Sequence, residues 1–125
     1  MRVGVLSGLK IVLLTPDTKR FRGALALAAA HVALYGSAEI FFQMDAAILL
    51  LRASAPRDVA HADAGMPALR ILMEEALDLG VTFTACQSGL TLAAIDAATL
   101  DPRIGISGTV AFLQGVATTD RLLFV

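Results

Sequence analysis

The sequence predicts one α/β domain over residues 1–125, built as a three-layer α/β/α sandwich around a mainly parallel sheet of four or five strands. Short β-branched and apolar runs alternate with helix-like segments, and this alternation favours right-handed crossovers within a parallel sheet. The strand-like runs are apolar almost throughout, as strands are when helices cover both faces of their sheet. With 57% hydrophobic residues, a chain of this length supplies one full core.

The first strand and the first helix are the clearest elements. We expect a strand over 9–15, LKIVLLT, that ends before Pro16. Asp17 or Thr18 can cap the following helix, and Gly36 ends it. Because this helix is apolar on nearly all sides, we expect more than one neighbour to bury it.

A second strand, SAEIFF, is expected over 37–42, and Asp45 is expected to cap a short helix that follows it. Residues 53–65 then form a long loop of small and polar residues, a candidate cover for a site. Pro67 suits the first position of the next helix, which Gly80 ends. The later elements are expected as a strand over 81–85, helices over 88–100 and 107–117, and a strand over 121–125. Residues 1–8 are read as either an arm or an extra strand.

Composition limits the partners. Ten basic and eleven acidic residues give a net charge of −1, and the absence of a basic run argues against nucleic acid. No apolar stretch reaches the roughly 18 residues of a membrane span. The hydrophobic fraction of 57% exceeds the usual 45–50% or so, which favours apolar surface buried in a homo-oligomer.

The cysteine count and the start of the chain indicate a compartment. A single cysteine cannot form an intrachain disulfide and suits a reducing environment. The opening MRVGVLSGLK lacks a long apolar stretch followed by a cleavage site, so it does not resemble a signal peptide. We therefore expect the cytoplasm.

That cysteine, Cys86, stands where an expected strand meets an expected helix, in VTFTACQSGL. The free N–H groups and partial positive charge of a helix start favour thiolate over thiol, which makes the sulfur a better nucleophile. Gln87, Ser88 and Gly89 follow as polar or small residues that could support an anionic sulfur species. The alternative is a buried cysteine that serves as a small apolar side chain. Catalysis requires a reachable sulfur, and a thiol sealed among aliphatic side chains would contradict it.

Other polar residues are expected to share the edge at which Cys86 lies. Ligands of open parallel sheets collect at the carboxyl ends of the strands, so Thr15 and Asp45 are expected to form part of a pocket rim. No metal site or cofactor is predicted. His31, within the first helix, and His61, in the long loop, are expected to be structural or solvated.

Two long stretches resemble the DsrE/DsrF-like family, which includes TusD-type sulfur carriers. They are KIVLLTPDTKRFRGALALAAAHVALYGSAEIFFQMDAAILL from Lys10 and GMPALRILMEEALDLGVTFTACQSGL from Gly65, and together they cover most of the chain. The resemblance implies the DsrE/flavodoxin-like form of the three-layer sandwich, assembled as a dimer, trimer or hexamer. It also implies that a cysteine at the position of Cys86 accepts sulfane sulfur as a persulfide and passes it to a cysteine of another protein.

The function expected on this basis is sulfane-sulfur binding or relay through Cys86. A chain with one cysteine needs a separate sulfur donor and acceptor, because it cannot resolve a persulfide internally. The alternative is a non-enzymatic homo-oligomeric module that binds a small anion or ligand at the strand ends, aided by Arg20 or Arg22. Peroxidase chemistry is disfavoured, because Phe83 stands where thioredoxin-fold peroxidases have threonine and no second cysteine is present.

Overall fold

The structure, a computed structural model, describes residues 7–51 and 63–125. Its helices and strands, in chain order, are β1 (Leu9–Leu13), α1 (Thr18–Ala33), β2 (Ala38–Phe42), the 3-10 helix η1 (Met44–Leu50), α3 (Leu69–Leu79), β3 (Thr82–Cys86), α4 (Gln87–Leu92), the 3-10 helix η3 (Ala97–Thr99), β4 (Gly105–Ser107), α5 (Thr109–Gln114) and β5 (Arg121–Phe124).

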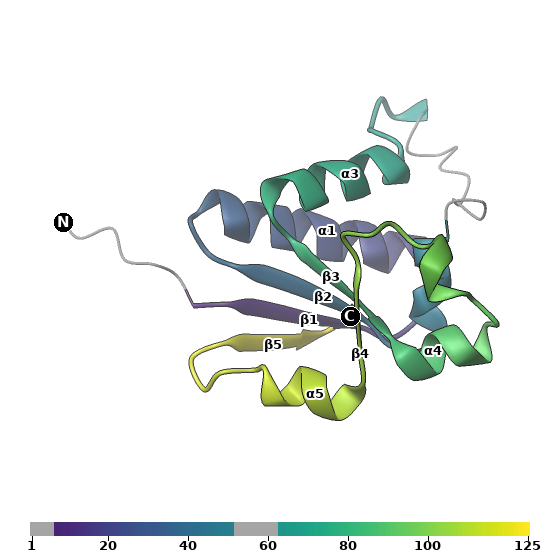
Figure 1. Cartoon of the computed structure of the whole chain (residues 1–125). Coiled ribbons are helices and arrows are strands. Elements are labelled where there is room, and N and C mark those ends of the chain that lie inside the picture. The colour runs from purple at the N-terminus through teal and green to yellow at the C-terminus, as the bar shows by residue number, and fades with distance from the viewer. Residues whose placement is uncertain (1–6, 52–62) are drawn as a thin grey trace.

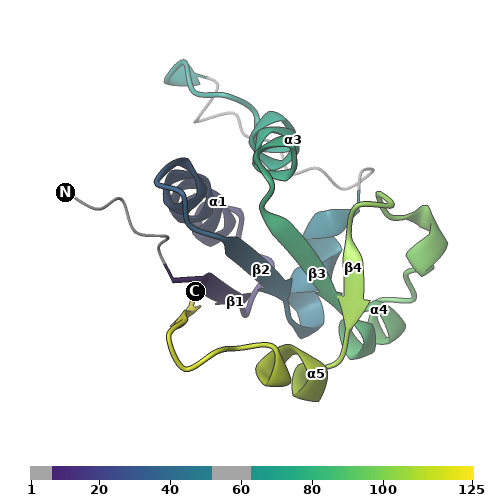
Figure 2. The ribbon, with the colours of Figure 1, turned by 60° about the vertical axis from the view of Figure 1, so that its left-hand side comes forward.

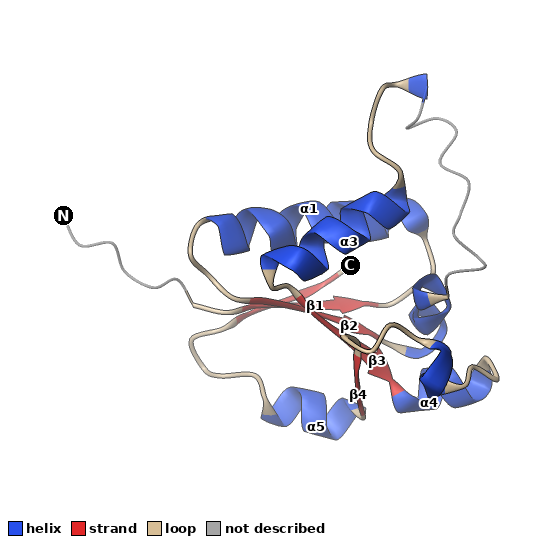
Figure 3. Ribbon diagram, turned by 45° about the horizontal axis from the view of Figure 1, so that its top comes forward, coloured by secondary structure: helices blue, strands red, loops and turns tan. Residues whose placement is uncertain are grey.

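The strands form one five-stranded sheet in the order β4-β3-β2-β1-β5, and every pair in it is parallel. Helices α1 and α3 lie on one face, and α5 lies on the other (Figures 1 and 3). The connection through α5 runs from β4 at one edge of the sheet to β5 at the opposite edge, and Figure 2 shows it passing beneath the strands. The predicted three-layer α/β sandwich is confirmed.

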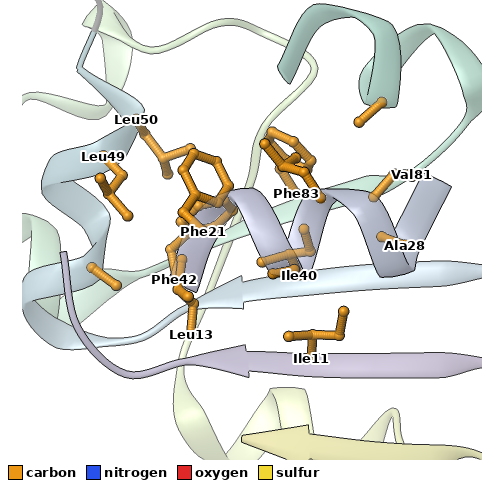
Figure 4. Close-up of a cluster of buried hydrophobic side chains, with 14 of the residues drawn as sticks. Ile11, Leu13, Phe21, Ala28, Ile40, Phe42, Leu49, Leu50, Val81 and Phe83 are labelled. Atoms are coloured by element: carbon orange, nitrogen blue, oxygen red, sulfur yellow. The ribbon is translucent and has the colours of Figure 1, made fainter. Parts of the chain in front are cut away.

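The main core lies between the sheet and the α1/α3 layer. Phe21 from α1 meets Phe42 and Phe83 from two neighbouring strands, with ring centroids 5.3 and 6.4 Å apart in edge-on arrangements. Ile11, Leu13 and Ile40 extend this packing along the same face of the sheet, and all six side chains are buried (Figure 4). Alternate strand residues therefore supply a dense apolar layer.

The cap at the start of α1 forms as predicted. The Asp17 carboxylate accepts hydrogen bonds from the backbone N–H groups of Lys19 (2.8 Å) and Arg20 (3.1 Å). The expectation that more than one neighbour buries this helix is correct, because α1 packs against α3 as well as against β1 and β2. The burial is incomplete, since Leu27 is 50% exposed.

The segment after β2 differs from the prediction. It is a 3-10 helix that starts at Met44, and the Asp45 side chain makes no capping bond there; Gln43 holds the N-cap position. Met44 adopts a left-handed backbone conformation with φ of 49°, so the chain turns directly after the strand. This early turn takes the cap position away from Asp45.

Two predicted helices are shorter in the structure, and one strand was missed. The helix expected over 88–100 ends at Leu92, because Ala94 adopts φ of 53° and Asp96 then caps a separate 3-10 turn through the Ala98 N–H. Residues 105–107 form β4, a three-residue strand that carries no apolar alternation. The last helix, expected over 107–117, spans only Thr109–Gln114.

Some expectations concern residues outside the described part of the chain. His61 and residues 53–62 of the long loop lie outside it, as do residues 1–6. Gly8 lies directly before β1, and its N–H donates to the carboxylate of Asp120, which directly precedes the adjacent strand β5 (3.0 Å). None of the helices in residues 7–51 and 63–125 has the length and hydropathy that a membrane crossing requires.

Replacing Phe21 with alanine is expected to lower the free energy of unfolding by about 3–5 kcal/mol, because the fully buried ring leaves a cavity between α1 and the sheet. Urea denaturation measures the loss. Leu27→Ala, at a half-exposed position of the same helix, is the control and is expected to cost below about 1 kcal/mol. Equal losses in the two variants would contradict the packing described.

Acid should weaken the α1 cap. The backbone N–H of Arg20, aided by that of Lys19, holds the pKa of the Asp17 carboxyl below its ordinary value of 3.8. A lowered folded-state pKa stabilises the fold above 3.8, and this stabilisation disappears as the pH falls through the folded-state pKa. The urea midpoint of the wild type should therefore exceed that of Asp17→Asn above pH 3.8 and approach it below the folded-state pKa. A difference between the two midpoints that stays constant over this pH range would contradict the assignment.

Candidate functional site

The carboxyl ends of the three central strands meet at one edge of the sheet. The parallel register aligns Leu13 with Phe42 in β1 and β2, and Phe42 with Ala85 in β2 and β3. The segments that leave these strands therefore begin side by side. Of the predicted site residues, Thr15 follows the first strand and Asp45 follows the second. Cys86 ends the third.

Cys86 joins β3 to α4 with no intervening loop. It is the last residue of the strand and also the N-cap of the helix, with extended dihedrals (φ −71°, ψ 123°). Thr82, Phe83 and Thr84 supply the β-branched and aromatic character of the strand, while the sequence from Gln87 onward continues as a helical turn. The prediction that Cys86 lies at a strand end and a helix start is therefore correct in geometry.

Gly89 lets the first turn of α4 pack tightly against the backbone after β2. A Cβ atom at this position would lie 2.3 Å from the carbonyl oxygen of Met44. Met44 itself has a left-handed backbone (φ 49°), which is uncommon for a residue with a side chain. The turn at Met44 and the absence of a side chain at Gly89 together let the segments after β2 and β3 approach closely at this edge of the sheet.

The thiol faces the α5 side of the sheet and is buried. Cys86 is 1% exposed and belongs to an apolar cluster with Val12, Phe41 and Phe112. The rings of Phe41, on β2, and Phe112, on α5, lie nearly parallel with centroids 4.4 Å apart. The structure therefore withholds the sulfur from solvent, and the reachable thiol expected from the sequence is not found in this conformation.

A polar network lies on the same sheet face, nearer the amino ends of the strands. The Lys10 ammonium contacts the Glu39 carboxylate (2.9 Å), and the Thr84 hydroxyl donates to the other oxygen of that carboxylate (2.6 Å). Thr84 and Cys86 are two residues apart in β3, so both side chains point to this face. Lys10 and Glu39 keep only 20% and 19% of their side-chain surface exposed, so water screens this pair less than a fully exposed one.

The other predicted site residues at this edge are exposed and are not hydrogen-bonded to the thiol. Thr15, Asp45, Gln87 and Ser88 are exposed. In residues 7–51 and 63–125, no hydrogen bond joins their side chains to Cys86. The structure therefore brings them to the same edge of the sheet as the thiol without linking them to it.

Two of the candidate side chains in α1, those of Arg22 and His31, bind partners elsewhere. Arg22 is buried and donates to the carbonyl oxygen of Pro67 (2.8 Å), next to α3. His31 donates through Nε2 to the carbonyl oxygen of Ser7 (2.6 Å), which lies just before the amino end of β1. Both side chains are engaged away from the carboxyl edge, whereas Arg20 remains exposed in the first turn of the helix.

Pockets occur elsewhere on the molecule. One, of about 380 Å³, lies between η1 and α3 and includes Leu50 and Ile71 in its lining. Another of similar volume lies between α1 and α3, beside Arg22. Neither is lined by Cys86. Across the described residues, no cluster of three or more histidine, cysteine, aspartate or glutamate side chains is suited to hold a metal ion.

Sequence reasoning missed the residues that cover the thiol. Phe112 is the one buried side chain of α5, and nothing near it in sequence links it to Cys86. Lys10 and Glu39 left a weak signal, since each interrupts an otherwise apolar strand. Two charges of opposite sign in neighbouring buried strands would have indicated a cross-strand ion pair.

The comparisons with known proteins identify the fold. No family model and no curated protein matches the chain. Three solved structures are similar over nearly its full length. The ychN protein from E. coli is 17% identical, with a TM-score of 0.67 and coverage of 96% of this chain and 99% of that one. MTH1491 from Methanobacterium thermoautotrophicum, a protein of unknown function, is 14% identical, with a TM-score of 0.69 and the same coverages. BT1422 from Bacteroides thetaiotaomicron, also of unknown function, is 14% identical, with a TM-score of 0.60 and 94% coverage of both chains.

The tight contact at Gly89 is expected to tolerate no side chain. Gly89→Ala should lower the free energy of unfolding by about 1–3 kcal/mol, because the Met44 backbone must move away from the added methyl group. Gly23→Ala, within α1 at a position with open space around it, is the matched control and should raise stability by about 0.5–1 kcal/mol. Urea denaturation compares the two, and a neutral Gly89→Ala would disprove the close approach.

Proposed function

We propose that this chain is a sulfane-sulfur carrier of the DsrE/DsrF-like kind, in which Cys86 takes up sulfur as a persulfide and passes it to a partner thiol. The observation that supports it is the position of Cys86, which ends a central strand and caps a helix at the carboxyl edge of a parallel sheet. Chemistry in such sheets collects at this edge. Full-length similarity to three solved structures supports the fold to which the resemblance points.

The chemistry needs only one thiolate. The Cys86 thiolate attacks the outer sulfur of a donor persulfide, R–S–SH; a new S–S bond forms on Cys86 as the donor S–S bond breaks. The donor leaves as the thiolate R–S⁻, and Cys86 carries the S–SH group. In the second step an acceptor thiolate attacks the outer sulfur and restores the Cys86 thiolate. Each step exchanges one S–S bond for another, so neither a metal nor an organic cofactor takes part.

Partners follow from the cysteine count. Because Cys86 is the only cysteine, the acceptor thiol belongs to another molecule, and so does the donor. Gln87 and Ser88 are exposed beside the thiol, and we assign them the role of polar support for the persulfide. Thr15 and Asp45, which leave the neighbouring strands at the same edge, are assigned to the rim that meets the donor or acceptor.

Self-association is part of the proposal. Val110, Leu113 and Phe124 are 72%, 52% and 64% exposed, and they come from α5 and from the edge strand β5. Large apolar side chains that are exposed favour contact between copies of a chain. We assign this region to a homo-oligomer interface of a dimer, trimer or hexamer.

Burial of the thiol favours a second candidate function. A cysteine that is 1% exposed among Val12, Phe41 and Phe112 also suits a purely structural role. In that case the chain is a non-enzymatic homo-oligomeric module that binds a small anion or ligand at the strand ends. The two functions differ in whether the sulfur atom reacts while the protein is folded.

Sulfur loading decides between these functions. After incubation with polysulfide, intact-mass spectrometry should find additions of about 32 Da per sulfur atom, as expected for a nucleophilic thiolate. Cys86→Ser should carry none, and a small thiol should remove the added sulfur from the wild type. Equal additions in both proteins, or none in either, would contradict the carrier function. The binding module instead predicts thermal stabilisation by an anion that survives the serine substitution.

A further inference from the structure

We propose that α5 and its flanking glycines, residues 108–115, form a hinged lid that opens locally to uncover Cys86 while the rest of the domain stays folded. The inference deepens the proposed function, because sulfur transfer requires a thiol that the closed structure withholds. It depends on three features of this lid segment: what it covers, how weakly it is attached, and where its glycines lie.

The lid segment supplies the cover over the thiol. The buried cluster around Cys86 contains Val12 from β1 and Phe41 from β2, both in the sheet itself, and a fourth member, Phe112, from α5. Phe112 is 5% exposed and stacks on Phe41 with ring centroids 4.4 Å apart. Figure 1 shows α5 on the opposite side of the sheet from α1 and α3. Val116, directly after the lid segment, and Leu122 of β5 are partly buried against the same cluster. Movement of α5 away from the sheet would therefore open the cluster that contains the thiol on the Phe112 side.

Few side chains hold this helix to the domain. Of the six residues of α5, only Phe112 is buried, while Val110 and Leu113 are 72% and 52% exposed. A helix this short is unstable without tertiary contacts. The closed position of α5 consequently rests mainly on Phe112, with Val116, just after the helix, partly buried against the same cluster.

Glycines stand at both ends of α5, although the closed backbone does not require them. Gly108 has an ordinary extended conformation (φ −91°), and an added Cβ would meet nothing within 4 Å. Gly115 has helical dihedrals (φ −82°), and its Cβ would lie 3.4 Å from the carbonyl oxygen of Phe112. By contrast, Gly80 needs its positive φ of 99° and Gly89 its close contact. The backbone of Gly108 and Gly115 can therefore adopt other dihedral angles, as hinge residues do when a segment moves to a second conformation.

Fixed points lie just beyond each hinge. Ser107 pairs with Cys86 in the sheet, directly before Gly108. On the other side, the Asp120 carboxylate accepts hydrogen bonds from the N–H groups of Gly8 (3.0 Å) and Ala117 (2.8 Å). These anchors confine the motion to the lid segment and the short turn that follows it.

The rate of thiol alkylation by iodoacetamide tests the lid under native conditions. Local opening predicts a labelling rate that hardly changes at low urea and then rises along the global unfolding line at higher urea. Phe112→Ala removes the anchor and should accelerate labelling in the native regime at least about tenfold. Gln114→Ala, at an exposed position of the same helix, is the control and should stay within about twofold of the wild type.

A second variant acts in the opposite direction, so its expected effect cannot be mimicked by destabilising the protein. Gly108→Ser with Gly115→Ala stiffens both hinges and adds a helix cap, so labelling should slow by about two- to fivefold per site. The lid is disproved if wild-type labelling follows the global unfolding line at all urea concentrations, or if the stiffened variant labels at the wild-type rate. Iodoacetamide needs no sulfur donor, so failure of the lid and failure of sulfur loading are separate results.

Discussion

Parallel pairing of β1, β2 and β3 is the constraint on which the rest of the structure depends. It aligns the carboxyl ends of the three strands at Leu13, Phe42 and Ala85, so segments far apart in the chain leave the sheet at one edge. It also requires apolar cover on both faces, because each strand presents side chains alternately to either side. The location of Cys86 and the need for a helix over it both follow from this pairing.

The two faces of the sheet are covered unequally. The α1/α3 side holds three interlocking phenylalanine rings and a large apolar cluster. The α5 side holds four buried residues and, next to them, the ion pair of Lys10 and Glu39. The thiol lies on the thinner side, where one short helix provides the cover. A side chain buried there can be exposed at a lower free-energy cost than one within the main core, because fewer contacts must break.

Local signals in the sequence predicted most of the architecture. The apolar runs located β1, β2, β3 and β5, and the carboxylate of Asp17 located the start of α1. The failures have particular causes. Met44 and Ala94 adopt left-handed conformations that neither residue type favours, so the turn after β2 and the early end of α4 gave no signal. The strand β4 has three residues, too few for an alternating pattern.

The sequence by itself determined that the only cysteine ends a strand and begins a helix, because both elements are encoded in the residues adjacent to Cys86. Only the tertiary structure decided that the cysteine side is closed by Phe112 and its helix. That contact joins residues 26 positions apart across a sheet edge, and no local pattern encodes a packing choice that depends on where the whole crossover runs.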